Sequence, residues 1–367
     1  MKHPSSMNLK EEDPKRESLR QRMPAEWEHH SATLLSWPHN RATWPGHRLE
    51  AVERVYLSIL RELTRSDHVI LLCGTKESSL YHHVQGIVDK SNLDRSRLTL
   101  LPLETNDVWA RDYGPIVVYS QNSEPKKPLY LNWRFNSWGG KYPPYDADDC
   151  VPNLLADQFS ISLKSIEFVL EGGSIEVNGA GTLLTTESVL LNPNRNPSFT
   201  KTDIEEILKI ELGLQQVIWL HSGLEGDDTD GHIDDLARFI DPKTIVCCVS
   251  EDSKDPNYET LQQNLSRLKE AKDVDGSSFR IIPLPMPDTR TNEQTVDGSD
   301  RVPASYANFY MANGRILLPL YDAATDEQAL SIFRENAAGF DIVGIPCRDL
   351  VWGQGSIHCI TQQLYGL

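Results

Sequence analysis

Apolar side chains recur along this chain in a repeating order. Residues 48–65 keep apolar positions on one face of a helix, and a short apolar run follows at 68–73. The same order of an amphipathic helix, a short link and a strand recurs four more times. The later predicted helix and strand pairs are 151–159 and 165–170, 202–212 and 215–220, 257–271 and 279–285, and 327–336 and 341–346. The alternation predicts an α/β fold, but the pattern alone does not decide how the units close.

Turn signals and charge divide the chain further. Asn-Gly dipeptides at 178–179 and 313–314 each separate two apolar runs and predict tight β-hairpins. Residues 1–22 are dense in charge and lack an apolar run, so we expect a disordered N-terminal tail that is not a signal peptide. No linker rich in Pro, Gly or Ser follows, which predicts a single domain over 23–367. Residues 285–301 lack periodicity and are predicted to form a surface loop, long enough to cover a site.

Composition excludes several classes of function. The chain has 36 basic and 53 acidic residues, a net charge of −17, and no clustered basic face, which argues against nucleic-acid binding. No apolar stretch approaches the roughly 18 residues that a membrane span needs. The six cysteines form no CxxC pair, so neither a zinc site nor a disulfide scaffold is supported, and a reduced cytoplasm fits best. An acidic surface suits a cationic small molecule, although solubility explains it equally well.

One segment concentrates the acidic residues. Residues 226–235 (GDDTDGHIDD) hold five aspartates around one histidine, and carboxylates this dense repel one another unless a cation compensates them. A calcium loop is excluded, because its first and twelfth positions would fall on Gly226 and Ala237, which offer no side-chain ligand. A zinc site is not supported, because His232 has no second histidine four residues later. Taken alone, the segment is best explained as a polar turn before a strand at 233–240.

Two other stretches place a carboxylate at the end of a strand. In 106–118 (NDVWARDYGPIVV), Asp112 either belongs to a buried ion pair with Arg111 or accepts a cation beside a wall formed by Trp109. In 168–179 (FVLEGGSIEVNG), Glu171 follows an apolar run directly before two glycines, where the backbone can turn sharply. From these residues alone, a carboxylate that accepts turn N–H groups is as good an interpretation as a functional one.

Cys359 differs from the other cysteines in its surroundings. It follows a glycine-rich turn within 351–363 (VWGQGSIHCITQQ), in a short strand-like run with polar neighbours. Cysteines inside apolar runs are usually small core residues. His358 is a candidate base, but adjacent residues of a strand point to opposite faces. We therefore predict that His232 is the partner of the thiol.

These residue types favour one kind of chemistry. One thiol, one histidine and several carboxylates, without a pattern of metal ligands, suit nucleophilic attack on a cationic carbon. A guanidinium group is such a target, because it is planar, permanently charged and matched by the two oxygens of a carboxylate. Burial of that cation without a partner would cost on the order of several kcal/mol, so flanking carboxylates are a physical requirement.

Eight segments of the chain resemble the agmatine deiminases, members of the guanidino-group-modifying superfamily that also contains the bacterial peptidylarginine deiminases. They are MPAEWE (23–28), SWPHN (36–40), NDVWARDYGP (106–115), LEGGSIEVNGAGTLLTTE (170–187), LLNPNRNP (190–197), DTDGHIDDLARF (228–239), PASYANFYMANG (303–314) and GSIHCITQQ (355–363). The likeness covers nearly the whole chain from residue 23. It implies a pentein fold, a five-bladed α/β propeller with pseudo-fivefold symmetry and its site on the central axis.

The resemblance also implies roles for individual residues. Cys359 matches the nucleophile of the family, and His232 matches its general acid and base. Asp112 and Asp234 match the carboxylates that grip the guanidinium nitrogens, and Glu171 matches a third acidic group of the pocket. No metal and no organic cofactor is implied.

The remaining matches concern the substrate. Trp109 and Asp228 match positions near the substrate chain. The plant members read GGNIHCITQQ where this chain has GQGSIHCITQQ, so Gln354 and Ser356 depart from the plant pattern beside the nucleophile. The implied reaction converts agmatine to N-carbamoylputrescine and ammonia through a covalent amidino–cysteine intermediate, and the family suggests a homodimer. The departure leaves the preferred alkylguanidine open.

Four alternatives to agmatine deimination stay open on the sequence. They are a peptidylarginine deiminase, a deiminase of another alkylguanidine, an amidinotransferase and a non-catalytic binding protein on a pentein scaffold. The joint presence of Cys359, His232, Asp112 and Asp234 argues strongly against the last of these.

Overall fold

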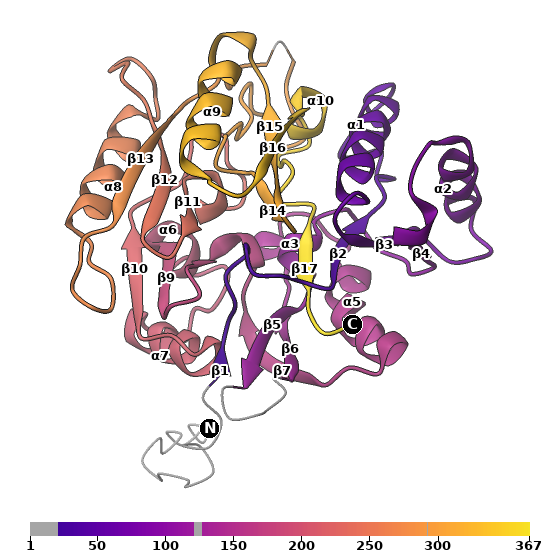
Figure 1. Cartoon of the computed structure of the whole chain (residues 1–367), viewed down its shortest axis with the longest axis horizontal. Helices are drawn as coiled ribbons and strands as arrows, with labels where there is room; N and C mark the ends of the chain where they lie inside the picture. The colour runs from indigo at the N-terminus through magenta and orange to yellow at the C-terminus, as the bar shows by residue number, and fades with distance from the viewer. Residues whose placement is uncertain (1–20, 121–126, 292) are drawn as a thin grey trace, which may run out of the picture.

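The structure is a computed structural model that describes residues 21–120, 127–291 and 293–367. Within this described part, the strands form five separate sheets of three or four strands, and Figure 1 shows them lying around the middle of the molecule. The α/β fold predicted from periodicity is therefore confirmed. The chain closes on itself, because β17 (Gln362–Leu364) near the C-terminus pairs antiparallel with β2 (Ala32–Ser36) near the N-terminus.

The five sheets share one construction. Each contains a pair of parallel strands joined through a helix, and an antiparallel strand beside the first of the two. The parallel pairs and their connecting helices are β2 with α1 (Arg48–Leu63) and β3 (His68–Leu72), β6 (Pro128–Arg134) with α5 (Asp146–Phe159) and β7 (Leu163–Val169), β9 (Thr182–Thr186) with α7 (Lys201–Leu212) and β10 (Gln216–Leu220), β12 (Thr244–Val249) with α8 (Tyr258–Glu270) and β13 (Arg280–Pro285), and β15 (Arg315–Leu320) with α9 (Ala323–Asn336) and β16 (Asp341–Pro346).

The other elements complete the sheets and the connections between them. The antiparallel partners are β17, β5 (Ile116–Ser120), β8 (Glu176–Val177), β11 (Ala237–Asp241) and β14 (Tyr310–Ala312). The remaining elements are β1 (Gln21–Arg22), β4 (Leu98–Leu101), α2 (Ser79–Lys90), α3 (Ala110–Tyr113), α4 (Ser137–Gly140), α6 (Glu187–Leu190), α10 (Arg348–Val351), η1 (Arg95–Arg97), η2 (Gly172–Ser174) and η3 (Ile233–Asp235).

Helix α7 shows how local sequence fixes an element. Thr200 and Asp203 form a capping box in which each side chain accepts a backbone N–H of the other residue, and this ends the helix toward the N-terminus. Gly213 ends it at the other side with a φ of 70°, a conformation that costs glycine little. Leu208 and Leu212 lie four residues apart on one face and are fully buried. The predicted range of 202–212 differs from the observed helix by one residue.

Of the two predicted hairpins, one is tight and one is not. Asn313-Gly314 joins β14 to β15 as a two-residue loop, because Ala312 pairs with Arg315. The loop between β8 and β9 is wider than predicted, since Val177 pairs with Leu183. The physical reason is that the Asn178 side-chain oxygen accepts the backbone N–H groups of Ala180 and Thr182, which holds an open loop.

The last two residues of the segment predicted as a disordered tail, Gln21 and Arg22, form a strand. Residues 1–20 lie outside the described residues, but Gln21 and Arg22 form β1, which pairs antiparallel with Ser120 and Tyr119 of β5. The partner strand lies about a hundred residues further along the chain, so local sequence gave no sign of this pairing. In the described part of the chain, no helix combines the length and the apolar character that a membrane span requires.

Candidate active site

The candidate residues lie at the ends of elements from different sheets. Asp112 lies in α3 just before β5, and Glu171 follows β7. His232 and Asp234 lie at η3 just before β11, whereas Cys359 lies in a turn just before β17. Strand ends are where a chain can place polar side chains without breaking the ladder of a sheet. The segment 233–240, predicted as strand throughout, is strand only from residue 237, because 233–235 form the η3 turn.

Cys359 lies at the inner wall of a cavity of about 570 Å³. Its side chain is mostly buried, with 8% of the residue exposed, and Asn308 Nδ2 donates a hydrogen bond of 3.1 Å to Sγ. The thiol lies 3.8 Å from Asp234 Oδ2. The strand-like run predicted around Cys359 is a turn instead, and β17 begins three residues later. This turn sends the sulfur into the cavity.

Asp112 lines this cavity beside the thiol, and Asp234 lies behind the lining. Asp112 accepts hydrogen bonds from Trp138 Nε1 at 2.9 Å and from the backbone N–H of Gly173 at 3.0 Å. His232 Nδ1 lies 3.8 Å from Asp112 Oδ1 and 4.0 Å from Asp234 Oδ1. Gly173 is required here, because an added Cβ would lie 2.6 Å from His232 Nδ1 and 2.8 Å from Asp112 Oδ1. The structure thus brings the thiol, the imidazole and both carboxylates together.

The protonation of these groups is set by burial. Burial raises the pKa of Asp112 to about 7, and the nearby Glu171 carboxylate adds to the shift. Burial and the charge of Asp112 raise the pKa of Asp234 well above its ordinary value. Burial is the main cause that raises the pKa of the Cys359 thiol, and the charge of Asp234 is the second. Burial is the main cause that lowers the pKa of His232, and the positive charge of Arg195 is the second. Without a cation, the site therefore favours a neutral thiol, a neutral imidazole and protonated carboxyls.

Of the seven candidate residues, the four that line the cavity are Trp109, Asp112, Asp228 and Cys359. Asp228 accepts a hydrogen bond of 2.6 Å from the Tyr142 hydroxyl, and burial raises its pKa to about 7. Trp109 forms an aromatic wall against Trp44, with ring centroids 5.7 Å apart. This part of the cavity suits a chain that is apolar along its length and cationic at its end.

The other three candidates, His232, Asp234 and Glu171, lie behind the cavity lining and are essentially fully buried. Glu171 pairs with Arg195, whose Nε donates to Oε1 at 2.8 Å. Arg195 also pairs with Asp230 and donates to the carbonyl of Thr229. Glu171 therefore anchors the segment before His232 through Arg195. This arginine was not predictable from local sequence beyond its place in the LLNPNRNP motif.

The loop at 285–301 reaches the cavity at one point. Val296 lines the cavity, and Gln354 Nε2 donates hydrogen bonds to Thr295 Oγ1 at 2.8 Å and Asp297 Oδ1 at 3.0 Å. Gln354 has a φ of 76°, which is unusual for a residue with a side chain. The residue that departs from the plant pattern thus joins this loop to the segment that carries the nucleophile.

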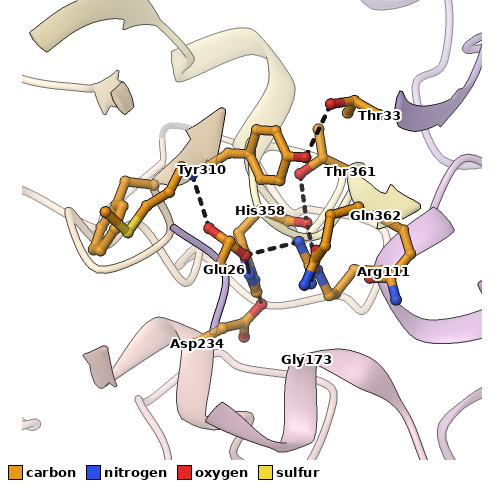
Figure 2. Close-up of polar contacts among 12 residues, drawn as sticks. Glu26, Thr33, Arg111, Gly173, Asp234, Tyr310, His358, Thr361 and Gln362 are labelled. Carbon is orange, nitrogen blue, oxygen red and sulfur yellow. Dashed lines mark hydrogen bonds and ion pairs between the residues drawn. The ribbon is translucent and has the colours of Figure 1, made fainter. Parts of the chain in front are cut away.

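A network of buried charges supports the site from behind, and we call Glu26, Arg111, Glu176, Arg238 and His358 the support network. Glu26 receives Arg111 NH2 at 3.1 Å and Arg238 NH2 at 2.9 Å. Arg238 Nε also donates to Glu176 Oε2 at 2.7 Å. Figure 2 shows His358 between Glu26 and Asp234. The sequence predicts that His232, and not His358, is the partner of the thiol. The His358 ring binds these two carboxylates instead.

Most of the support network, and the contact of Asn308 with the thiol, were not predictable from the sequence. Glu26 lies in the MPAEWE motif and Asn308 in the PASYANFYMANG motif, but nothing in the local pattern linked either residue to the thiol. Asn308 accepts the backbone N–H of His358 at 2.9 Å through Oδ1 while its amide nitrogen contacts the sulfur. The available signal was a polar residue that lies within a family motif and is flanked by apolar residues, which indicates a buried polar side chain.

The geometry defines a class of site. A thiol and an imidazole each lie within 4.0 Å of Asp234, beside a cavity lined by Asp112, which forms no ion pair with a lysine or arginine of the described residues. This arrangement suits a cysteine-dependent enzyme for a cationic small molecule. Within the described residues, no cluster of three or more His, Cys, Asp or Glu side chains is arranged to hold a metal ion.

Comparison with known proteins gives the family. Residues 22–364 match the family of Porphyromonas-type peptidyl-arginine deiminases, and the chain belongs to it. The chain is 34% identical over 359 residues to the agmatine deiminase of Stutzerimonas stutzeri, with 93% of this chain and 94% of the relative covered.

Solved structures agree with this assignment. The agmatine deiminase of Enterococcus faecalis superimposes with a TM-score of 0.85 at 30% identity, over 98% of this chain and 99% of the other. The agmatine deiminase of C. jejuni, solved as a cysteine-to-serine variant with substrate bound, superimposes with a TM-score of 0.83 at 32% identity, over 94% of this chain and 96% of the other. The family resemblance inferred from motifs is thereby confirmed.

Proposed function

We propose that this protein is an agmatine deiminase, which hydrolyses the guanidinium group of agmatine to N-carbamoylputrescine and ammonia. The observation that carries the proposal is the joint approach of Cys359 Sγ at 3.8 Å and His232 Nδ1 at 4.0 Å to the Asp234 carboxylate. The names of the relatives and the cavity of about 570 Å³, a size typical of small-molecule sites, support it.

The reaction begins when the guanidinium enters the inner end of the cavity. Asp112 and Asp234 hold its N–H groups, because two carboxylates match the planar, charged donor set. The positive charge offsets the carboxylates that raise the thiol pKa, so the thiol proton can move to His232. The Cys359 sulfur then forms a bond to the guanidinium carbon, and a C=N electron pair moves onto nitrogen.

Two further steps complete the turnover. His232 donates its proton to the leaving nitrogen, the C–N bond breaks, and ammonia departs from an amidino–thioether on Cys359. His232 then takes a proton from water as the water oxygen attacks the same carbon. The added hydroxyl loses its proton as the ureido C=O forms and the C–S bond breaks, and His232 returns its proton to the sulfur. The surplus proton, equivalent to the charge of the guanidinium, converts the released ammonia to ammonium, and the ureido product leaves. No metal and no organic cofactor takes part in these steps.

The remaining residues have supporting roles in this proposal. Trp109 and Asp228 contact the four-carbon chain and its terminal ammonium, since both line the cavity beside the reacting end. Glu171 acts through Arg195 to place the segment that carries His232. The substrate is a cationic small molecule, and the acidic cavity offers nothing to attract a nucleic acid.

The proposal extends to the architecture. Five units of the same construction, each with a parallel strand pair joined through a helix, support a five-bladed propeller with pseudo-fivefold symmetry. Residues 23–367 then form one pentein catalytic domain after the N-terminal segment. We further propose that the protein is a cytoplasmic homodimer, which gel filtration with light scattering and fractionation of cells would test.

An ammonia-release screen tests the proposed function. Agmatine, free arginine, arginine peptides and shorter guanidines are supplied separately, and the products are identified by mass spectrometry. We expect ammonia and N-carbamoylputrescine from agmatine. Turnover of arginine peptides alone would assign a peptidylarginine deiminase, and ammonia release only with an added amine acceptor would assign an amidinotransferase. Absence of product from every guanidine would contradict catalysis altogether.

A further inference from the structure

Two carboxylates bracket one imidazole directly behind the site. His358 Nδ1 lies 2.7 Å from Asp234 Oδ2, and His358 Nε2 lies 2.8 Å from Glu26 Oε2. The three side chains are at most 5% exposed, so water does not fill these gaps. Figure 2 shows the row formed by Glu26, His358 and Asp234. Asp234 is the member of the row that also approaches the thiol.

The number of protons in this row follows from its distances. Both gaps are hydrogen-bond distances, and two lone pairs facing each other at such a distance would repel, so each gap holds one proton. Three groups therefore share two protons. Either His358 is an imidazolium between two carboxylates, or a neutral His358 donates to one carboxylate and accepts from the other, which is protonated. The net charge of the row is −1 in both states.

The neighbours on the Glu26 side favour ionised Glu26. Against the effect of burial, Arg238, His358 and Arg111 hold the pKa of Glu26 well below its ordinary value. The backbone N–H of Met311 adds a hydrogen bond of 2.8 Å to Glu26 Oε1. Burial is the main cause that lowers the pKa of His358, and the positive charges of Arg111 and Arg238 add to this shift.

The neighbours on the Asp234 side are carboxylates, the thiol and the His232 imidazole, whose Nδ1 lies 4.0 Å from Asp234 Oδ1. Burial is the main cause that lowers the pKa of His232, so this imidazole adds no positive charge. Burial is the main cause that raises the pKa of Asp234, and the Asp112 and Asp227 carboxylates add to the shift. Arg238 and Arg111 offset these effects only in part. Asp235 is also close enough for its own pKa to be raised by Asp234. Cys359 adds no cation. In the substrate-free protein, the shared proton therefore belongs on Asp234, and His358 Nε2–H donates to Glu26.

We propose that binding of a guanidinium moves this proton from Asp234 Oδ2 to His358 Nδ1. The O–H bond of Asp234 breaks and an N–H bond of His358 forms, so the row keeps two protons and a charge of −1. Asp234 becomes the carboxylate that the cation needs, and no proton leaves to solvent from this row. His358 and Glu26 are positioning residues in this device, since they act on the substrate only through Asp234.

A physical reason favours this transfer over release to water. The substrate cation stabilises ionised Asp234, while Glu26 and Asp234 stabilise the imidazolium that forms between them. Without Glu26, Arg111 and Arg238 would oppose a positive charge on His358, and Asp234 would have to give up its proton to solvent. The inference rests on the proposed function, because it requires a guanidinium in the cavity.

The test uses the Cys359→Ser protein, which lacks the reactive thiol, with histidines labelled with ¹⁵N in the ring. Agmatine is titrated in at constant pH, and the His358 signals are assigned from the spectrum of the protein that also carries His358→Gln. We expect both ring nitrogens of His358 to change from the neutral to the imidazolium pattern as agmatine saturates. His30 serves as the internal control, because it pairs with Asp67 at 2.9 Å away from the cavity, and its signals should not change.

An imidazolium signal before agmatine is added, or a neutral His358 at saturation, would overturn the inference. Calorimetry in buffers of different ionisation enthalpy gives a second readout. Relative to Cys359→Ser alone, adding Glu26→Gln or His358→Gln should release about one additional proton per agmatine bound at neutral pH. Weaker binding with an unchanged proton count would assign these residues a merely structural role. Absence of agmatine binding by Cys359→Ser would contradict the proposed function itself, and with it this device.

Discussion

Glu26 and Asp112 are both carboxylates with 5% of the residue exposed, yet they lie in opposite electrostatic surroundings. Glu26, in the support network, receives two guanidinium groups within 3.1 Å. Asp112, at the cavity, forms no ion pair with a lysine or arginine of the described part of the chain and is bound by an indole and a backbone N–H. The pKa of Glu26 is lowered and that of Asp112 is raised to about 7.

The difference identifies the missing partner. Where the fold needs a buried carboxylate for support, it supplies the compensating cation from its own chain, as Arg111 and Arg238 do for Glu26. At Asp112 the described part of the chain supplies no ion-paired lysine or arginine, so a cationic ligand is the partner that would compensate this carboxylate. Glu176 is an instructive exception, because burial raises its pKa to about 7 even though Arg238 pairs with it. It shares that arginine with Glu26, which indicates that one cation does not fully compensate two carboxylates.

Removal of the thiol is the strongest way to separate the two regions. Cys359→Ser should lower kcat by at least about 10⁴-fold, because a serine hydroxyl in this acidic setting is a poor nucleophile. Agmatine binding should persist, since the carboxylates are untouched, and isothermal titration calorimetry checks it. Cys150→Ser is the matched control, because Cys150 is exposed, and it should retain full activity. Undiminished turnover by Cys359→Ser would remove this residue from the mechanism.

Removal of a cation from the support network should have the largest effect on stability. Arg238→Met leaves Glu26 and Glu176 short of a buried partner, which should lower the free energy of unfolding by about 3–5 kcal/mol. Denaturation in urea measures the change. Arg134→Met serves as the control, because its side chain is 52% exposed and its ion pairs contribute little. Equal stability of the two variants would contradict the supporting role assigned to Arg238.

The opposite result is expected at the cavity. Asp112→Asn removes a charge that has no paired lysine or arginine in the substrate-free protein, so the folded state should gain up to about 4 kcal/mol at pH 8. The same change should cost about 2–5 kcal/mol of interaction with the guanidinium, seen as a fall in kcat/KM. Urea denaturation and steady-state kinetics measure the two effects. A variant that loses both activity and stability would show that Asp112 belongs with the support network.

The pH dependence of kcat/KM tests the same difference between the cavity and the support network, with smaller expected effects. Asp112 and Asp228, each with a pKa of about 7, must ionise to hold a cation. Below pH 7, kcat/KM should therefore fall by up to about tenfold per unit for each group that must ionise.

The stability that Asp112 contributes should rise as pH falls, whereas kcat/KM should fall. A pKa raised on folding means that the folded state binds the extra proton, so Asp112 stabilises less as pH rises from about 4 to 7. The stability gained by Asp112→Asn should then grow by up to about 1.4 kcal/mol per unit over this range and level off above it. A gain that shrinks as pH rises would contradict the raised pKa.

The helices and strands were largely predictable because their signals are local. The five predicted helix and strand pairs match α1 with β3, α5 with β7, α7 with β10, α8 with β13, and α9 with β16, since burial of one helix face leaves a periodic record in the sequence. The tight turn at Asn313-Gly314 was predictable for the same reason. The wide loop after Val177 and the pairing of β1 with β5 were not, because each depends on hydrogen bonds that the local pattern does not specify.

The candidate site divides along the same line. The sequence by itself determined which reactive groups exist, namely a thiol in a polar setting and a histidine among aspartates, and its motifs pointed to the family. Only the tertiary structure decided how they are paired. It paired Glu171 with Arg195 and placed His358 between Glu26 and Asp234. Glu26 and Asp234 are 208 residues apart in the sequence. The physical reason is that a buried charge is stabilised by whichever partner folding brings within about 3 Å, and that partner leaves no periodic trace beside it in the chain.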